Sequence, residues 1–151
     1  ERFEAPFSAV LIAVDDDGLG GGVTDILRGD NYNVLGVSAA TLANRPDRYP
    51  NKRSELWFQG AEMGRTGLLD LTELAEEEFN FLRADLLAPA YRHDKKGRRV
   101  VEPKDQIRRR LGRSPDFGDS FNLAVVEVYS RNFAGAFRGE IDPFESLDSW
   151  Y

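Results

Sequence analysis

The sequence predicts an α/β fold with a mostly parallel central sheet, flanking helices and an added β-hairpin. Three observations favour this class. A strand, a glycine turn, a helix and a second strand follow one another over 7–37; helical periodicity recurs over 71–87 and 116–130; and 90–102 is typical of two strands joined by a glycine turn. The chain has 151 residues, 41% of them hydrophobic, which suits one domain of ordinary size.

The first strand–helix–strand unit opens with an apolar, partly β-branched run, 7–14, that ends in three aspartates, as a buried strand of a parallel sheet does. The glycines of 18–22 turn the chain, and apolar residues within 23–27 have helical spacing, with Gly29 as the expected C-cap. Residues 32–37 form the second strand. Open α/β sheets bind ligands at the carboxyl ends of their strands, so the aspartates lie where chemistry is expected.

Two helices are expected in the middle of the chain. Residues 38–50 contain turn residues and two prolines, so we expect a loop there. Residues 54–63 then predict a helix that directs Trp57 and its neighbours into the core. Residues 71–87 predict a longer amphipathic helix, ended by Pro89.

The last third of the chain predicts a β-hairpin over 90–102, turning at Lys95-Lys96-Gly97, and a short basic helix over 104–111. The sequence Ser114-Pro115-Asp116 is typical of a helix start, with serine as N-cap and proline as the first helical residue, and this helix runs to about Ser130. The expected domain is therefore 1–130. The remainder, 131–151, is an aromatic, acidic tail that docks on its own domain or on a partner.

Several kinds of chemistry are excluded by composition. The chain has no cysteine, so disulfides, thiolate zinc sites and thiol nucleophiles are absent. Its one histidine is His93, so a Ser-His-Asp triad would depend on a histidine that we expect to be exposed and that has no nucleophile turn near it. Val23 stands where a dinucleotide-binding loop needs its third glycine, and no P-loop is present. Any catalysis must use carboxylates, whose oxygens suit Mg²⁺ and Mn²⁺. The longest apolar run is six residues against the roughly 20 of a membrane span, and signal-peptide features are missing, so we expect neither membrane insertion nor secretion.

Charge is distributed unevenly along the chain. The formal net charge is −6, yet 92–113 carries ten basic and three acidic residues. An acidic domain with one basic stripe is typical of a protein that contacts a polyanion on one side, although a solvated loop and helix would give the same pattern. The candidate DNA-binding residues are Lys95, Lys96, Arg98, Arg99, Lys104, Arg108, Arg109, Arg110 and Arg113.

Two groups of acids are candidates for a metal site. Asp15, Asp16 and Asp17 follow the first strand, and alternation of side chains allows one or two of them to share a site. Asp116 and Asp119 are three residues apart on a helix and therefore neighbours on one face. Clustered carboxylates repel one another unless cations or basic residues neutralise them. A divalent metal would do so, and two such ions can activate a water and stabilise the leaving oxygen in phosphodiester cleavage. The alternative is that the first group begins a turn and the second decorates a helix N-terminus.

Three segments in this order, VDDDGLGGGVTDIL, YPNKRSELW and EPKDQIRRRLGRSPDFGDSFNLA, resemble the C-terminal nuclease domain of tailed-bacteriophage terminase large subunits. The resemblance covers about residues 9–130 and implies a ribonuclease H-like fold, of the resolvase and integrase type. It also implies endonucleolytic cleavage of concatemeric double-stranded DNA with two Mg²⁺ or Mn²⁺ ions, in the host cytoplasm, beside the portal protein and the terminase small subunit.

The resemblance also implies roles for single residues. Asp15 and Asp119 match the metal-binding acids, with Asp116 as companion. Asp25 matches an acid that we expect to be structural. Three residues match a segment that is either structural or DNA-facing: Lys52, Arg53 and Glu55.

One departure from the family is that 1–10 does not supply the strand with the first metal-binding acid, so the chain resembles only the later part of the domain. A site built from the remaining acids is expected to bind metal weakly, because ligand number and charge set affinity. The chain is then a fragment, a split gene product or a degenerate remnant. The alternative function is a non-catalytic module that binds DNA or a packaging partner.

Overall fold

The computed structural model describes residues 11–18, 20–65, 67 and 69–133, with side chains described up to residue 125. The elements, in chain order, are β1 (Ile12–Asp15), α1 (Gly20–Gly29), β2 (Val34–Val37), α2 (Lys52–Arg65), α3 (Glu76–Leu87), β3 (Tyr91–His93), β4 (Arg99–Val101), α4 (Lys104–Leu111) and α5 (Asp116–Phe133). Within this part of the chain, no helix is both long enough and apolar enough to cross a bilayer.

The parallel sheet consists of β1 and β2, paired from Ile12 opposite Val34 to Asp15 opposite Val37. The crossover between them is α1, as the strand–helix–strand pattern predicts. Helix α1 starts so close to β1 that a Cβ at Gly20 would lie 1.7 Å from the carbonyl oxygen of Asp15. Glycine is therefore required at this turn, which fixes where the chain leaves the site edge of the sheet.

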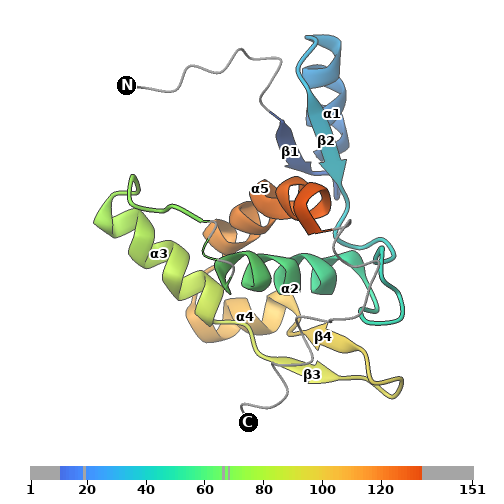
Figure 1. Cartoon of the computed structure of the whole chain (residues 1–151), viewed down its shortest axis with the longest axis vertical. Helices are drawn as coiled ribbons and strands as arrows, with labels where there is room; N and C mark the ends of the chain where they lie inside the picture. The colour runs from blue at the N-terminus through green and yellow to red at the C-terminus, as the bar shows by residue number, and fades with distance from the viewer. Residues whose placement is uncertain (1–10, 19, 66, 68, 134–151) are drawn as a thin grey trace.

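The helical body is centred on α5, which packs against α2, α3 and β1 (Figure 1). Its contacts with both the sheet and the other helices join the two halves of the molecule. Val37 and Leu56 form one buried cluster with Leu123, and Met63 and Val125 form a second. The core is thus a seam along α5 between the sheet and α2.

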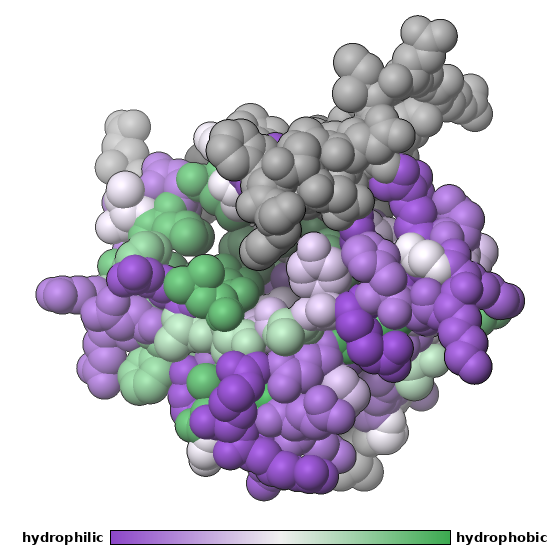
Figure 2. Space-filling model, turned by 90° about the horizontal axis from the view of Figure 1, so that it is seen from below, coloured by the Kyte–Doolittle hydropathy of each residue, from purple (hydrophilic) through white to green (hydrophobic). Residues whose placement is uncertain are grey.

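The hairpin pairs β3 with β4 in antiparallel fashion, from Tyr91 opposite Val101 to His93 opposite Arg99. It is fastened to α2 by a hydrogen bond from the Val101 amide to Ser54 Oγ at 3.2 Å. Helix α4 follows directly, as the sequence predicts, and lies beside the hairpin in Figure 1. The face in Figure 2 is largely hydrophilic, with apolar side chains gathered within it.

Several expected boundaries differ from the structure. Strand β1 begins at Ile12 rather than residue 7, and 7–10 lie outside the described residues, as does the tail from 134 onward. The helix expected over 71–87 begins at Glu76, whereas α2 extends beyond the expected 54–63 at both ends. Pro115 is buried and lies one residue before α5 rather than within it, so the expectation of Ser114 as N-cap is wrong.

Helix α1 also differs from expectation at its end and on its apolar side. Gly29 is its last residue, and the left-handed conformation that ends the turn occurs at Asn31, with φ 63°. Val23 and Ile26, two of the apolar residues with helical spacing, are exposed, while Thr24 is buried. Thr24 is buried because its hydroxyl donates to Asp16, which turns the polar residue toward the sheet.

Candidate metal and nuclease site

The three aspartates after β1 point in different directions. Asp16 accepts a hydrogen bond from Thr24 Oγ1 at 2.6 Å, so it ties α1 to the sheet. Asp17 accepts from Ser38 Oγ and, at 3.0 Å, from the Ala39 amide, so it closes the loop after β2. Asp15 is exposed, and one of its oxygens accepts the Asp17 amide at 3.2 Å. Successive side chains along a strand point to opposite faces, so Asp16 lies on the other face from Asp15 and Asp17.

The first turn of α5 is capped by a residue from another helix. Asp85 of α3 is fully buried, and its Oδ2 accepts the amides of Phe117 at 3.0 Å and Gly118 at 3.2 Å. Its Oδ1 forms an ion pair with Arg113 at 2.6 Å. A helix N-terminus favours negative charge, so this carboxylate fixes the start of the helix that carries Asp116 and Asp119.

Lys104, the first residue of α4, joins the two acids of α5. Its Nζ lies 2.6 Å from Asp119 Oδ2 and 3.6 Å from Asp116 Oδ1. Burial alone would lower the pKa of Lys104, but the hydrogen bond and charge of Asp119, followed by the charges of Asp116 and Asp15, outweigh it and raise the pKa. The ammonium is therefore held protonated among the carboxylates. Asp116 lies at the exposed rim, whereas the side chain of Asp119 is mostly buried.

Arg53 of α2 is a further cation at this site. Its Nη1 donates to the carbonyl of Glu102 at 2.7 Å, and its guanidinium lies over the Trp57 ring. Burial lowers the pKa of Arg53, although the charges of Asp119 and Glu102 oppose that effect. Nη2 is buried and has no hydrogen-bond partner among the described residues. The guanidinium therefore contributes positive charge to the site, with one nitrogen unpaired inside the described fold.

One cavity of about 160 Å³ brings these charged groups together. Its polar lining residues are Asp15, Asp17, Arg53, Lys104, Asp119 and Asn122, and its other lining residues are Val37, Ala39, Leu56, Trp57 and Leu123. The predicted pair of Asp15 and Asp119 is thus brought together from β1 and α5, and Asp116 is not among the lining residues. Sequence reasoning missed Asn122. Its position one helical turn after Asp119 was the available signal, because residues three apart share a helix face.

The donors of this cavity fit a hard divalent cation in kind. Mg²⁺ takes oxygen ligands and is commonly held by one or two carboxylates together with waters and substrate phosphates, which matches Asp15 and Asp119. Within the described residues, no cluster of three or more His, Cys, Asp or Glu has the geometry to hold a metal. The cavity therefore offers part of a metal site, with Lys104 already paired to Asp119, one of its three carboxylates.

Lys52, Arg53 and Glu55, expected to be either structural or DNA-facing, differ in what they contact. Glu55 is fully buried and accepts the amides of Asn44 at 2.9 Å and Arg45 at 3.0 Å, and Lys52 Nζ lies 2.7 Å from it. These two residues hold the loop before α2, which is structural, while Arg53 faces the cavity. Asp25, expected to be structural, is instead largely exposed, 3.9 Å from Arg28.

About half of the basic stripe is engaged inside the fold. Arg98 pairs with Asp94 at 2.8 Å, Arg110 donates to the carbonyl of Ala88 at 2.6 Å, and Arg113 binds Asp85. The guanidinium of Arg99 lies 5.4 Å from the Phe58 ring centre. Of the candidate DNA-binding residues, those that are exposed and have no such described role are Lys95, Lys96, Arg108 and Arg109.

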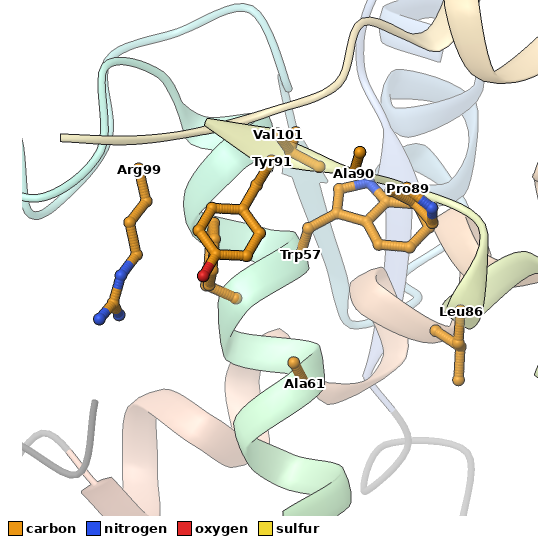
Figure 3. A pocket seen from close by; sticks show the side chains of 9 residues that line it. Trp57, Ala61, Leu86, Pro89, Ala90, Tyr91, Arg99 and Val101 are labelled. Carbon is orange, nitrogen blue, oxygen red and sulfur yellow. The ribbon is translucent and has the colours of Figure 1, made fainter. Parts of the chain in front are cut away.

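An apolar pocket of about 220 Å³ lies between α2, the end of α3 and the hairpin (Figure 3). Trp57 lines both this pocket and the acidic cavity. The remaining lining is mainly apolar: Phe58, Ala61, Leu86, Pro89, Ala90, Tyr91 and Val101, with Arg99 as its charged member.

No family model and no curated protein matches this sequence. The fold is similar to solved structures of the nuclease domain of the large terminase subunit gp2 of bacterial virus Sf6. That domain has a TM-score of 0.59 and 16% identity over 76% of this chain. A mutant form with manganese and beta-thujaplicinol has a TM-score of 0.60 at 15% identity, and one with calcium has 0.58 at 15%. The match spans 63–64% of those chains.

Proposed function

We propose that this chain is a metal-dependent endodeoxyribonuclease module of a phage DNA-packaging terminase, with a ribonuclease H-like fold. The observation that carries the proposal is the meeting of Asp15 and Asp119, from the end of β1 and from α5, in one cavity. The neighbouring folds are nuclease domains, and some were solved with manganese or calcium. Both facts favour phosphodiester hydrolysis over the other functions open to a cysteine-free α/β domain.

Asp15 and Asp119 would hold Mg²⁺ or Mn²⁺, with Asp116 as a supporting acid at the rim. A bound divalent ion, or the pair of ions that the family resemblance implies, supplies an activated water and stabilises the leaving oxygen. Cleavage in a packaging terminase would act on concatemeric double-stranded DNA in the host cytoplasm, in contact with the portal protein and the small subunit.

The residues of this chain set the charge and geometry of the site. The Asp17 amide orients the Asp15 carboxylate, and Lys104 orients Asp119. Lys104 also offsets the repulsion between these carboxylates before a cation arrives. Arg53, which lines the same cavity, adds a positive charge that attracts the phosphates of DNA.

DNA would lie against the exposed members of the basic stripe. Lys95 and Lys96 at the hairpin turn and Arg108 and Arg109 on α4 can neutralise phosphates at no cost to the fold. The engaged arginines, such as Arg98 and Arg113, are held by internal acids. Such backbone contacts release counterions, so affinity for DNA should fall steeply as salt increases.

The test is plasmid cleavage with Mn²⁺ and with Mg²⁺ by the wild-type chain and by Asp15→Asn and Asp119→Asn. We expect metal-dependent nicking or linearisation that either substitution abolishes. Asp25→Asn is the matched control, because it removes an exposed carboxylate from α1, outside the cavity. Cleavage that survives both site substitutions, or that is lost equally in the control, contradicts the proposal.

A non-catalytic DNA-binding module is the second candidate. It is favoured by two contacts that already engage carboxylates of the cavity: Lys104 neutralises Asp119, and the Ala39 amide holds Asp17. This candidate predicts salt-sensitive DNA binding in fluorescence anisotropy without cleavage under any divalent metal. Comparison with a chain extended upstream separates a truncated enzyme, active on extension, from such a module.

A further inference from the structure

The apolar pocket between α2, the end of α3 and the hairpin has no part in the proposed hydrolysis. It holds about 220 Å³, and three of its lining residues, Ala61, Ala90 and Tyr91, are exposed, so it opens to solvent. An apolar cavity of about 150 Å³ is enough to bind benzene. The pocket is therefore large enough to accept one aromatic ring from outside the described fold.

The walls of this pocket favour an aromatic occupant. Phe58 of α2 and Tyr91 of β3 meet edge to face, with ring centres 5.3 Å apart and ring planes at 84°. Trp57 also lines the pocket, and Figure 3 shows it together with Tyr91. Aromatic rings in edge-to-face or offset contact gain more than their buried area alone provides. A further ring would therefore bind here more tightly than an aliphatic side chain of similar size.

The surroundings of the pocket are basic. Arg99 is its charged lining residue, and Lys95 and Lys96 are exposed at the turn of the same hairpin. Opposite charges around an apolar contact favour one partner over others and fix its orientation. The occupant that suits this pocket is therefore an aromatic residue with acidic neighbours.

Residues 140–148 of the same chain have this composition. Phe144 is their only aromatic residue, and Pro143 directly before it restricts the backbone, so less conformational entropy is lost on docking. The segment contains no Lys or Arg, and its charged residues are Glu140, Asp142, Glu145 and Asp148.

The chain between α5 and this segment is long enough to reach the pocket. Helix α5 passes the pocket at Gly118, where an added Cβ would lie 2.8 Å from Cη2 of Trp57. Its last residue, Phe133, lies about 22 Å further along at 1.5 Å per residue. An extended chain from Phe133 spans about 36 Å by Phe144, which leaves slack to pass around a helix about 10 Å wide. By Phe137 it spans only about 13 Å, which is too short.

We propose that the apolar pocket is the docking site of residues 140–148 of the same chain, with the ring of Phe144 beside Trp57 and the flanking acids near Arg99 and the hairpin turn. Ring size, aromatic walls, opposite charge and chain length all favour this occupant. The docking site goes beyond the proposed hydrolysis and does not depend on it, because the contact uses neither Asp15 nor Asp119.

The experiment compares the full chain with Phe144→Ala and with the matched control Phe137→Ala. Both tryptophans carry a 5-fluoro label, so fluorine NMR reports on the surroundings of Trp57, and Trp150→Phe assigns the two resonances. Endoproteinase Glu-C measures how often the bond after Glu145 is exposed. Phe144→Ala should shift the Trp57 resonance and raise the rate of this cleavage about tenfold, because burial of one aromatic side chain is lost. Phe137→Ala should change neither.

A substitution in the pocket tests the other side of the contact. Ala61 is exposed on α2 and lines the pocket, so Ala61→Leu fills the space without disturbing the core. It should raise cleavage after Glu145 as much as Phe144→Ala does, and the double variant should show no further increase, because both changes remove the same contact. Ala90→Leu, at the hairpin side of the pocket, replaces it if circular dichroism shows that Ala61→Leu does not fold.

Three results would overturn the proposal. The first is a Trp57 resonance and a cleavage rate that are the same in Phe144→Ala as in the unsubstituted chain, or that change equally in Phe137→Ala. The second is a Trp57 resonance that responds to Trp150→Phe but not to Phe144→Ala, which places a different residue in the pocket. The third is protection of Glu145 that depends on protein concentration, which assigns the pocket to a second copy of the chain.

Discussion

Replacing Asp85 by alanine should destabilise the domain more than any single change on its surface. The carboxylate is fully buried, accepts two amides at the start of α5 and pairs with Arg113 at 2.6 Å. Alanine leaves both amides and the guanidinium without this partner. Helix α5 packs against α2, α3 and β1, so loss of its first turn affects the whole described fold.

The size of the effect follows from these contacts. Removing one member of a buried ion pair costs about 3–5 kcal/mol. Arg113 is about one-third exposed and can partly reach water, so the lower end applies. Loss of a helix cap adds about 1 kcal/mol. We therefore expect about 3–4 kcal/mol for Asp85→Ala, and about half of that for Asp85→Asn, which keeps an acceptor for the amides but not the charge.

Urea unfolding followed by far-ultraviolet circular dichroism at pH 7 measures this loss. With a slope of about 2 kcal/mol per molar urea, the midpoint should fall by about 1.5–2 M. Asp105→Ala, which removes an exposed carboxylate from α4, is the control and should change the midpoint by less than about 0.3 M. A shift for Asp85→Ala no larger than that of the control would refute the assignment of Asp85 as the cap of α5.

Three further predictions concern other charged contacts. Glu55→Gln should cost about 3 kcal/mol, because it leaves Lys52 and two loop amides poorly paired, and amide hydrogen exchange should rise over 39–50. The hydrogen bond from the Ala90 amide lowers the pKa of Glu102; burial opposes this effect and Arg110 adds to it. The stability that the Glu102 carboxylate contributes is therefore present above its ordinary pKa of 4.5 and is lost as pH falls through its pKa in the folded protein. The difference in urea midpoint between wild type and Glu102→Gln should vanish in acid. The carboxylates of Asp119 and Asp116 raise the pKa of Lys104 above its ordinary value of 10.5, so the stability that its charge contributes is complete below 10.5 and is lost as pH rises through the folded pKa. Lys104→Met should therefore have a lower urea midpoint than wild type at pH 8, and the difference should shrink as pH rises past that pKa.

Local patterns predicted the elements and the two groups of acids that contain Asp15 and Asp119, and the resemblance selected these two residues within them. The apolar run that ends in aspartates indicated both β1 and the position of Asp15, because strand polarity and alternation are local properties. The meeting of Asp15 with Asp119 followed from resemblance rather than from spacing. Contacts between residues about a hundred positions apart depend on how α5 crosses the sheet, which no local pattern encodes.

Other features depended on tertiary partners that the sequence does not reveal. Ser114-Pro115-Asp116 suggested a local N-cap, yet Asp85 of α3 supplies the acceptors instead. The exposed positions of Val23 and Ile26 follow from Thr24 turning toward Asp16. Counting charges located the basic stripe but did not show which of its residues are available to DNA, because internal acids pair with several of its arginines. Periodicity and charge counts predict which side of an element is apolar or charged, but the contacts of that side depend on residues distant in the sequence.

The position of Trp57 gives the chain an optical reporter. Trp57 lines the apolar pocket, as Figure 3 shows, and it also lines the acidic cavity. The chain has one other tryptophan, Trp150, so replacing that residue by phenylalanine leaves emission from a single ring. Paramagnetic Mn²⁺ bound on one side would quench that emission, and an apolar molecule entering on the other side would shift its wavelength, which distinguishes occupancy of the two spaces without labelling.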